Sequence, residues 1–465
     1  MQNQNENENI TVRDVIQIDN ELLQNISSLI EDEANQAIKT IFTNLHPADI
    51  AEIINHLPFD DAQYAFGLLD TETAVEVVTE LDEELREKVL NELDKEKITD
   101  IVDELDTDDA TDIVSDLPDE VAEHVLDNID PEDSEDVKEL MKYPEESAGG
   151  LMNSDFISVD INALVKDAIE AVRIGSLEEK IEDIYTIYIL ADDETLLGFV
   201  HLKELIINPP ETPLKNIMEE DLIYVTADMD QEEVANIMDK YDLISIPVVD
   251  ENKKMLGRIT IDDVVDVIQE EAAEDLQKVA GLSEDEEYSY STIRISRNRL
   301  PWLFVSLGGE LISAGVLSSF QASIEQIIIA SFFIPIVMAL GGSAGSQAAI
   351  VTVQGMSGAN IWWHDVVKRL MKEFRVATLN GFVASIVLLL ASKLFFSAEL
   401  DFGLILSLSL FIIIVNATMI GAIVPVIFKK LGVDPAIATG PIVSSANDIM
   451  GLLIYLSLVT IFFTV

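Results

Sequence analysis

The stretch GPIVSSANDIMGLLIYL, residues 440–456, is apolar enough to cross a membrane, yet it carries one carboxylate, Asp448. An ionised carboxylate near the middle of a bilayer costs on the order of 3 kcal/mol or more by insertion scales. No Lys or Arg lies inside any long apolar stretch of this chain except near its ends, so an ion pair explains Asp448 poorly. A protonated structural Asp is one alternative. Otherwise the sequence predicts that a permeating cation is the partner of Asp448.

Five such apolar stretches make up the C-terminal part of the chain. They cover about 301–320, 326–353, 376–397, 403–428 and 435–464, and each can cross a hydrocarbon core of roughly 30 Å. Lys and Arg cluster before the first stretch, between the second and third, and between the fourth and fifth, which predicts that these loops face the cytoplasm. We therefore predict a five-helix all-α transmembrane domain over 299–465, in the cell (plasma or inner) membrane, with a cytoplasmic N-terminus and the C-terminus outside. The segment ANIWWHDVVKRLMKEF is amphipathic, and Trp362 and Trp363 suit an interfacial anchor.

The acidic residues are concentrated before the membrane part. The 465 residues include 28 Lys and Arg and 86 Asp and Glu, of which 18 and 78 precede Ser291. This charge repels phosphate and excludes nucleic acid as a default partner, whereas it suits cations. For many of these carboxylates, solubility or adaptation to a salt-rich cytoplasm is the alternative explanation. The chain has no Cys, which excludes disulfides and thiolate metal sites.

The N-terminal part of the chain is repetitive. Residues 1–20 are polar and acidic, lack the features of a signal peptide, and are predicted to form a disordered cytoplasmic tail. The segments HPADIAEIINHLP, DTETAVEVVTELD and DKEKITDIVDELD start 24 residues apart, at His46, Asp70 and Asp94. Each has apolar residues at helical spacing, and a second helical unit follows each one. We therefore predict an acidic α-helical solenoid over 21–142, whose short helices bury their apolar faces by stacking.

Strands and helices alternate from Tyr143 to about residue 268, and the order β-α-β-β-α occurs twice. The signals LISIPVVD and GRITIDDVV make this duplication resemble a pair of α/β cystathionine-β-synthase (CBS) domains, over 143–208 and 209–268. The resemblance implies a regulatory module that binds an adenosine nucleotide or another effector. In the second copy Gly257, Thr260 and Asp263 match a ribose and phosphate site. The first copy has His201 in the Thr position, which disfavours a nucleotide there.

A helix rich in carboxylates joins the CBS pair to the membrane part. At 100° per residue, Asp263, Asp266, Glu270 and Glu274 share one face, with Glu271 beside them. Like charges on one face destabilise a helix unless a cation neutralises them. A solvated face is the alternative. Because this helix is the only connection to the membrane, we predict a connecting helix over 269–298 that responds to cations.

Polar side chains also lie within the apolar stretches. Ser343, Ser346 and Gln347 could line a polar path, although close helix packing through small residues explains the same pattern. One carboxylate with hydroxyls, amides and carbonyls is a hard-oxygen environment that lacks the ligands of softer metals. Mg²⁺ keeps much of its water, so its site needs few protein ligands. A homodimer around a two-fold axis would bring two copies of Asp448 to one pore.

The whole chain resembles the MgtE family of magnesium transporters. The most specific stretches are RLPWLFVSLGGELIS, FIPIVMALGGSAGSQ and KKLGVDPAIATGPIVSSANDIMGLLIYL, and the resemblance covers nearly all residues. It implies a homodimeric, Mg²⁺-selective channel in the lipid bilayer. Cytoplasmic Mg²⁺ is implied to close this channel by binding between the acidic domains and the connecting "plug" helices, and ATP at the CBS pair to tune that response.

The resemblance also assigns roles to individual residues. In the pore, Asp448 is implied to hold the hydrated ion, and Ser444 to offer its backbone carbonyl. Asn447, Ser343 and Ser346 are further predicted pore residues; the family commonly has Asn and Thr in GGNxGTQ where this chain has the two Ser, which bears on ion selectivity. The regulatory metal residues are predicted to be Asp108, Asp112, Asp230, Glu232, Asp242, Asp263, Asp266, Glu271, Glu274 and Asp275. A nucleotide would contact Thr260 and Asp263.

Together these observations predict a non-enzymatic Mg²⁺ channel or transporter that imports Mg²⁺ and closes when cytoplasmic Mg²⁺ rises. A CBS-regulated transporter of another divalent cation, such as Co²⁺, is one alternative. A membrane-anchored metal sensor without ion flux is another, and it predicts no effect of Asp448→Ala beyond stability. An anion channel is disfavoured by the carboxylate and by the lack of Lys or Arg within the membrane. No Gly-rich phosphate loop or catalytic constellation supports an enzyme.

Overall fold

The structure is a computed structural model that describes residues 18–177, 184–280, 282, 292–356, 363–438 and 440–463. Most of the predicted N-terminal tail and Trp362 lie outside the described residues. The chain divides into two compact units, one up to Val267 and the other from Ile268 onward. Each unit is described separately below.

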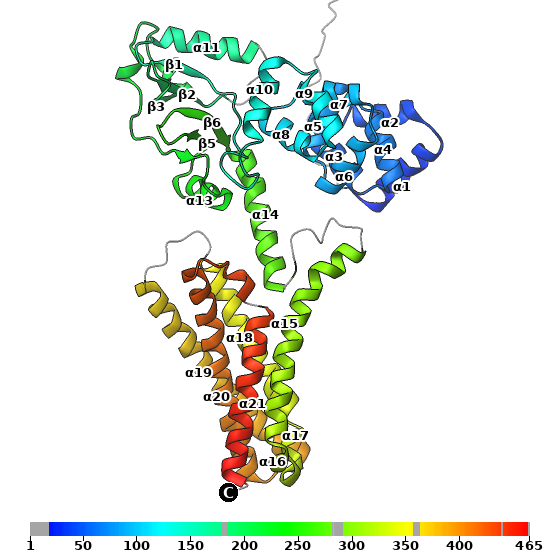
Figure 1. The fold of residues 1–465 in the computed structure, drawn as a ribbon, viewed down its shortest axis with the longest axis vertical. Helices are drawn as coiled ribbons and strands as arrows, with labels where there is room; N and C mark the ends of the chain where they lie inside the picture. The colour runs from blue at the N-terminus through cyan, green and yellow to red at the C-terminus, as the bar shows by residue number, and fades with distance from the viewer. Residues whose placement is uncertain are drawn as a thin grey trace, which may run out of the picture. The chain divides into compact units, whose positions relative to one another are not determined.

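The first unit begins with a solenoid of short helices, as predicted (Figure 1). Helices α3, α5, α7 and α9 stack in one row, and α4 stacks on α6. The apolar residues that define the repeat, including Ile50, Ile53 and Ile54, are fully buried between these rows. The helices are α1 (Asn20–Glu31), α2 (Asn35–Phe42), α3 (Pro47–Asn55), α4 (Phe59–Gly67), α5 (Thr71–Thr79), α6 (Glu83–Asn91), α7 (Lys95–Val102), α8 (Thr107–Asp116), α9 (Asp119–Leu126) and α10 (Pro131–Leu140).

Acidic residues and prolines mark the starts of the solenoid helices and so separate each helix from the one before it. Asp70 accepts a 3.0 Å hydrogen bond from the backbone N–H of Thr73, which satisfies one of the free donors at the start of α5. Pro47 and Pro131 stand at helix starts, where a missing N–H costs nothing. The acidic surplus of this part is therefore partly structural, because several Asp residues precede or cap helices.

The two CBS copies follow with the same topology. In each three-stranded sheet the middle strand pairs with one parallel and one antiparallel neighbour, in the order β1-β2-β3 and β4-β5-β6. Tyr188 on β2 and Ser245 on β5 share a 3.0 Å hydrogen bond between the copies. The elements are β1 (Ser158–Asp160), α11 (Val165–Leu177), β2 (Thr186–Leu190), β3 (Leu196–His201), α12 (Leu202–Ile207), η1 (Leu214–Asn216), β4 (Val225–Thr226), α13 (Gln231–Tyr241), β5 (Ser245–Val249), β6 (Met255–Thr260) and α14 (Ile261–Ala280).

The segment between the solenoid and the CBS pair is tied to the second copy. Asn153 and Arg258 on β6 exchange two backbone hydrogen bonds of 2.8 and 2.9 Å. A Cβ at Gly257 would lie 2.5 Å from the carbonyl oxygen of Asn153, so the backbone can come this close only to a glycine. The position matched to a nucleotide site by sequence thus also has a packing role.

Helix α14 belongs to both units. Its first part packs Val264 and Val267 into the core of the second CBS copy. The helix therefore begins inside the CBS fold, eight residues before the predicted start of the connecting helix at 269, and ends at Ala280. It is continuous because no Pro or Gly interrupts residues 261–280.

Among the described residues of the second unit, five helices are long and apolar enough to cross a membrane. Helices α15 and α18 each contact α21, and α20 contacts α18, α19 and α21 (Figure 1). Small residues allow the closest of these contacts, because a Cβ at Gly421 on α20 would overlap the backbone of Gly345 on α18. The elements are α15 (Thr292–Ser319), α16 (Gln321–Gln326), α17 (Ile328–Ser331), α18 (Ile334–Gln354), α19 (Trp363–Phe396), α20 (Leu400–Lys430), η3 (Ala436–Ala438) and α21 (Pro441–Phe463).

The helix bounds differ most from the predicted spans in four places. The first helix, α15, begins at Thr292 instead of 301 and continues through Pro301. The second span is interrupted before α18, because Pro335 in its first turn cannot continue a helix from α17. The third helix begins at Trp363 instead of 376, so the amphipathic segment forms its first turns and is not separate from it. The fifth begins at Pro441 rather than 435, because a turn and the short η3 precede it.

Candidate functional site

The membrane unit places two carboxylates in contact. Asp448 on α21 is in hydrogen-bonding contact with Glu310 on α15. The two helices can approach here because Gly309 is buried and a Cβ at this position would overlap the side chain of Ser445. Two carboxylates this close repel each other unless a proton or a metal cation lies between them. The pair is therefore suited to bind a cation within the membrane-spanning helices.

Asn447 lies next to Asp448 and faces different helices. It is 3% exposed, and a Cβ added to Gly345 would overlap its side-chain nitrogen. Within the described part of the chain, neither its amide nitrogen nor its amide oxygen has a hydrogen-bond partner. A buried polar group without a partner costs about 1–3 kcal/mol. Burial of this amide therefore lowers the stability of the fold. Polar contacts between Asn447 and an ion or its water would compensate for that loss.

The predicted Ser residues lie on α18 and α21. Ser444 and Asp448 are one turn apart in α21. Ser343 is exposed and Ser346 is partly buried, on either side of Gly345 on α18. Ser444 lies in the first turn of α21, one turn before Asp448, and its N–H donates to Gly440 at 3.2 Å. Among the described residues, no hydrogen bond joins Ser343 or Ser346 to Asp448. Their role in an ion path therefore stays a prediction.

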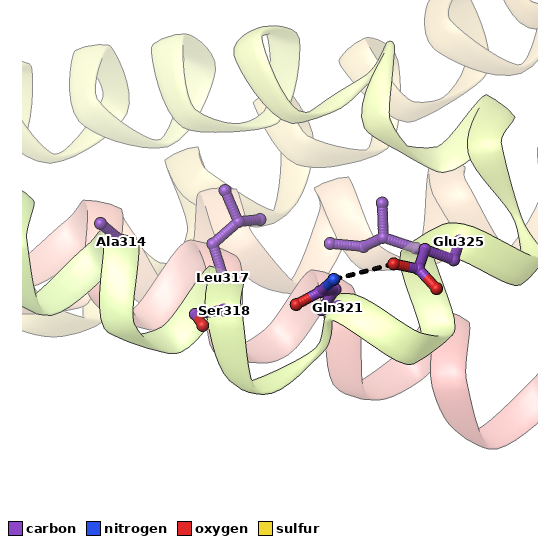
Figure 2. A pocket seen from close by; sticks show the side chains of 6 residues that line it. Ala314, Leu317, Ser318, Gln321 and Glu325 are labelled. Carbon is purple, nitrogen blue, oxygen red and sulfur yellow. Dashed lines mark hydrogen bonds between the residues drawn. The ribbon is translucent and has the colours of Figure 1, made fainter.

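A shallow open pocket lies elsewhere on the membrane unit, along the end of α15 and on α16 (Figure 2). Its two longest polar side chains are already engaged, because Gln321 donates a 2.8 Å hydrogen bond to Glu325. None of the predicted pore residues lines it. The lining residues are Ala314, Leu317, Ser318, Gln321, Ile324 and Glu325. We therefore do not assign the pocket to the ion path.

In the first unit, α8 and the start of α14 bring acidic side chains together. Burial, followed by the neighbouring charges of Asp109, Asp263 and Asp106, raises the pKa of Asp108 well above its ordinary value. Burial and the charge of Asp263 raise the pKa of Asp109 to about 7. Burial and the charge of Asp262 raise the pKa of Asp263 to about 6. These shifts mean that the carboxylates oppose one another's ionisation, so a cation would relieve the repulsion.

This acidic cluster, Asp106, Asp108, Asp109, Asp262 and Asp263, is not a ready-made metal site. In the described ranges, no three His, Cys, Asp or Glu side chains gather as direct ligands of one ion. One oxygen of Asp108 is buried and has no hydrogen-bond partner among the residues that the structure describes. A hydrogen bond between neutral groups joins the start of α8 to the segment that leads into the CBS pair, since Ser154 donates its N–H to the Thr107 hydroxyl at 2.9 Å. The arrangement suits a hydrated cation better than a fully coordinated one.

The other predicted regulatory carboxylates lie on α8, around α13 and along α14. Asp112 lies on α8 beside the cluster, and its charge also raises the pKa of Asp109. Asp230 caps α13 by accepting from the N–H of Glu232 at 3.0 Å, and Asp242 ends that helix in a left-handed conformation with φ 52°. Asp266 lies one turn after Asp263, and burial raises its pKa. Glu271, Glu274 and Asp275 follow on α14 within the second unit. Within the first unit, the structure thus brings Asp108 and Asp112 near Asp263.

The predicted nucleotide residues contact each other. The Thr260 hydroxyl donates to Asp263 at 2.9 Å and also contacts Asp262. Asp263 additionally accepts a 3.3 Å hydrogen bond from the Thr260 N–H, which caps the start of α14. Asp263 therefore belongs to both the acidic cluster and the predicted nucleotide site.

Sequence reasoning missed Glu310, Asp109 and Lys278. Glu310 could have been found by the argument applied to Asp448, because it is a carboxylate within the first apolar stretch. Asp109 follows Asp108 directly, and the sequence does not tell that both adjacent carboxylates are removed from solvent. Lys278 is a cation on a helix whose predicted role rests on its carboxylates, and it contacts Glu274 and Asp434.

Comparison with known proteins first defines the class. The family model "Divalent cation transporter" matches residues 334–458, "MgtE intracellular N domain" matches 45–146, and "CBS domain" matches 214–270. The chain is thus a membrane transporter of the divalent-cation class, and the prediction that it is not an enzyme is confirmed.

Individual relatives then define the family. The Magnesium transporter MgtE of Bacillus subtilis (strain 168) is 35% identical over 71% of this chain and 72% of that protein. The Magnesium transporter MgtE of Thermus thermophilus is 32% identical over 69% and 71%. A structure described as the cytosolic domain of the Mg²⁺ channel MgtE in complex with ATP is 30% identical, with a TM-score of 0.49, and covers 53% of this chain and 99% of that one. The chain belongs to the MgtE family of magnesium transporters.

Proposed function

We propose that this chain is a Mg²⁺-selective channel that imports Mg²⁺, and that the ion passes Asp448. The observation that carries the proposal is the contact between Asp448 and Glu310 inside membrane-spanning helices. Carboxylates in such positions mark ion paths, because lipid cannot compensate their charge. The oxygen-rich neighbours Asn447 and Ser444 suit a hard cation that retains its water.

The channel is a homodimer in this proposal. Glu310 is exposed on the surface of a single chain although it lies within a candidate span, Ile295–Ser319. A carboxylate on that surface is costly against lipid but not against a second copy or a hydrated pore. Two copies of the Asp448 and Glu310 pair would then share one path. The N-terminus is cytoplasmic, in keeping with the distribution of Lys and Arg.

Cytoplasmic Mg²⁺ closes this channel in the proposal. Burial and then the charges of neighbouring carboxylates raise the pKa values of Asp109 and Asp263, so ionisation of the acidic cluster is unfavourable in the absence of cations. An ion that neutralises the cluster favours the arrangement in which α8 and α14 are together. Binding to one arrangement alone shifts the population toward it. Because α14 continues into the membrane unit, this arrangement can reach the pore helices.

The proposal is tested by measuring Mg²⁺ influx into proteoliposomes of the full chain. We expect influx at low Mg²⁺ on the side of the acidic domains, and loss of influx when Mg²⁺ on that side reaches millimolar levels. Co²⁺ measured in parallel decides between Mg²⁺ selectivity and transport of another divalent cation. A protein that binds Mg²⁺ without any flux would instead support a membrane-anchored sensor.

The CBS pair is further proposed to bind an adenosine nucleotide such as ATP at Thr260 and Asp263. Their hydrogen bond of 2.9 Å orients a hydroxyl and a carboxylate at the start of α14. We expect ATP to bind the purified chain, measured by calorimetry, and Thr260→Val to weaken binding by about tenfold, the effect of losing roughly one polar contact. Lys203→Gln, in the first copy, is the matched control. If Thr260→Val bound ATP with the affinity of the wild type, the proposed nucleotide site at Thr260 and Asp263 would be wrong.

A further inference from the structure

Lys278, near the end of α14, connects that helix to the segment between two membrane helices. Its ammonium contacts Glu274 one turn earlier and lies 3.1 Å from a carboxylate oxygen of Asp434. The side chains of Lys278 and Asp434 are only 22% and 30% exposed, so solvent screens the pair partially. Burial acts to lower the pKa of Lys278, but the hydrogen bonds to Glu274 and Asp434 outweigh it and the pKa lies above its ordinary value.

Asp434 has a second contact that bears on α21. Its other carboxylate oxygen accepts a 2.7 Å hydrogen bond from the N–H of Ala436, which starts the short helix η3. Helix η3 contacts α18, α20 and α21, and α21 begins at Pro441. One carboxylate therefore both shapes the segment that leads into the Asp448 helix and binds a Lys on α14.

We propose that Lys278 is the positioning residue that couples α14 to the start of α21, through an ion pair that it shares between Glu274 and Asp434. This inference rests on the proposed closure by Mg²⁺. A Mg²⁺ ion that neutralises Glu274 weakens the ion pair between Glu274 and the ammonium group of Lys278. The ammonium group then interacts more strongly with Asp434, and α14 is held on the α20–α21 segment. In the absence of Mg²⁺, Glu274 competes with Asp434 for the ammonium group of Lys278, and the attachment of α14 to the α20–α21 segment weakens.

The first test measures the inhibition of Mg²⁺ influx by Mg²⁺ on the side of the acidic domains. Lys278→Gln is expected to raise the half-inhibitory concentration by about fivefold, the lower range of measured coupling between sites. Asp434→Asn should have the same effect, since Asn keeps an oxygen for the Ala436 N–H and loses only the charge. The double variant should be no worse than either single one, because both remove one interaction.

Two controls separate coupling from a general loss of structure. Lys278→Arg keeps the charge and should restore inhibition close to that of the wild type. Lys166→Gln breaks another Lys–carboxylate pair, with Glu211 at 3.1 Å on the CBS surface, and should change nothing. Wild-type inhibition in Lys278→Gln, or effects that add in the double variant, would overturn the proposal.

A second experiment decides the inference even if the wild type does not close in Mg²⁺, an outcome that would reject the proposed closure itself. The chain has no Cys, so K278C/D434C supplies the only two thiols. A bifunctional thiosulfonate reagent about as long as a Lys side chain should link them in membranes and lower influx, and a reducing agent should restore it. Failure to link, or linkage without a change in influx, would show that this contact does not control the pore.

Discussion

Replacing Asp448 by Asn will reduce Mg²⁺ influx by more than about tenfold, because a unit charge at 4 Å contributes on the order of 4 kcal/mol per charge at an effective dielectric constant of 20. Asn has nearly the same shape, so the variant should fold and insert as the wild type does. Influx into proteoliposomes at low Mg²⁺ on the acidic side measures the effect. Asp401→Asn is the matched control, because Asp401 is exposed in the first turn of α20.

Glu310→Gln tests the same site from α15. Glu310 contacts Asp448, so its neutralisation should reduce influx, but less than Asp448→Asn, which removes the carboxylate on the pore helix. The double variant should transport no less than Asp448→Asn alone, since the pair acts as one cation site. Equal influx in the wild type and in Asp448→Asn would exclude the ion path proposed here.

The second large effect concerns closure. Neutralising Asp263, Asp266, Glu271, Glu274 and Asp275 together should leave influx active at millimolar Mg²⁺ on the acidic side, with a half-inhibitory concentration at least about tenfold higher than in the wild type. The reason is that the variant lacks the carboxylates through which Mg²⁺ is proposed to bind α14, so Mg²⁺ no longer shifts the population toward the closed arrangement. Asp192 and Asp193, in an exposed turn of the CBS pair, provide a control double variant. Normal closure by Mg²⁺ in the variant with all five carboxylates neutralised would refute the assignment of the regulatory residues.

The acidic cluster also predicts that the proposed closure of the channel by Mg²⁺ depends on pH. The pKa of Asp109 is about 7 in the folded chain, against an ordinary value of 3.8, so the folded state binds more protons between these values. The stability of the α8–α14 contact is therefore present at low pH and lost as pH rises through 7. Mg²⁺ replaces the missing protons, so Mg²⁺ should protect residues 105–112 from hydrogen exchange more strongly at pH 8 than at pH 5.5. Equal protection at both pH values would contradict this origin of the Mg²⁺ response.

The architecture could be predicted because it depends on patterns that are local in sequence. The 24-residue repeat gives Ile50, Ile53 and Ile54 a single face, and stacking then buries them. Hydrophobic length identifies the membrane helices, but it does not locate their ends. Pro335 and Pro441 set two of these ends through backbone constraints that hydropathy does not measure.

The candidate sites were harder to predict because they join residues far apart in the chain. Asp448 is conspicuous alone, whereas its contact with Glu310 depends on how closely α15 and α21 pack at Gly309. Asp108 and Asp263 were predicted by resemblance, but the burial that raises their pKa values is a property of the folded unit. Lys278 was missed because its partner Asp434 lies 156 residues later in the chain.

The hydrogen bonds of Thr107 determine what kind of movement the acidic cluster can drive. Its hydroxyl accepts from both the N–H and the hydroxyl of Ser154, at 2.9 and 3.0 Å, and these bonds join neutral groups. Ionic strength and Mg²⁺ act on charges, so they leave this attachment intact. In the proposed opening, repulsion among the neighbouring Asp residues would therefore turn the solenoid about Thr107 instead of releasing it. Such an attachment would keep the carboxylates near each other in the open state, so that under the proposed regulation a Mg²⁺ ion could bring them together again without a diffusional search.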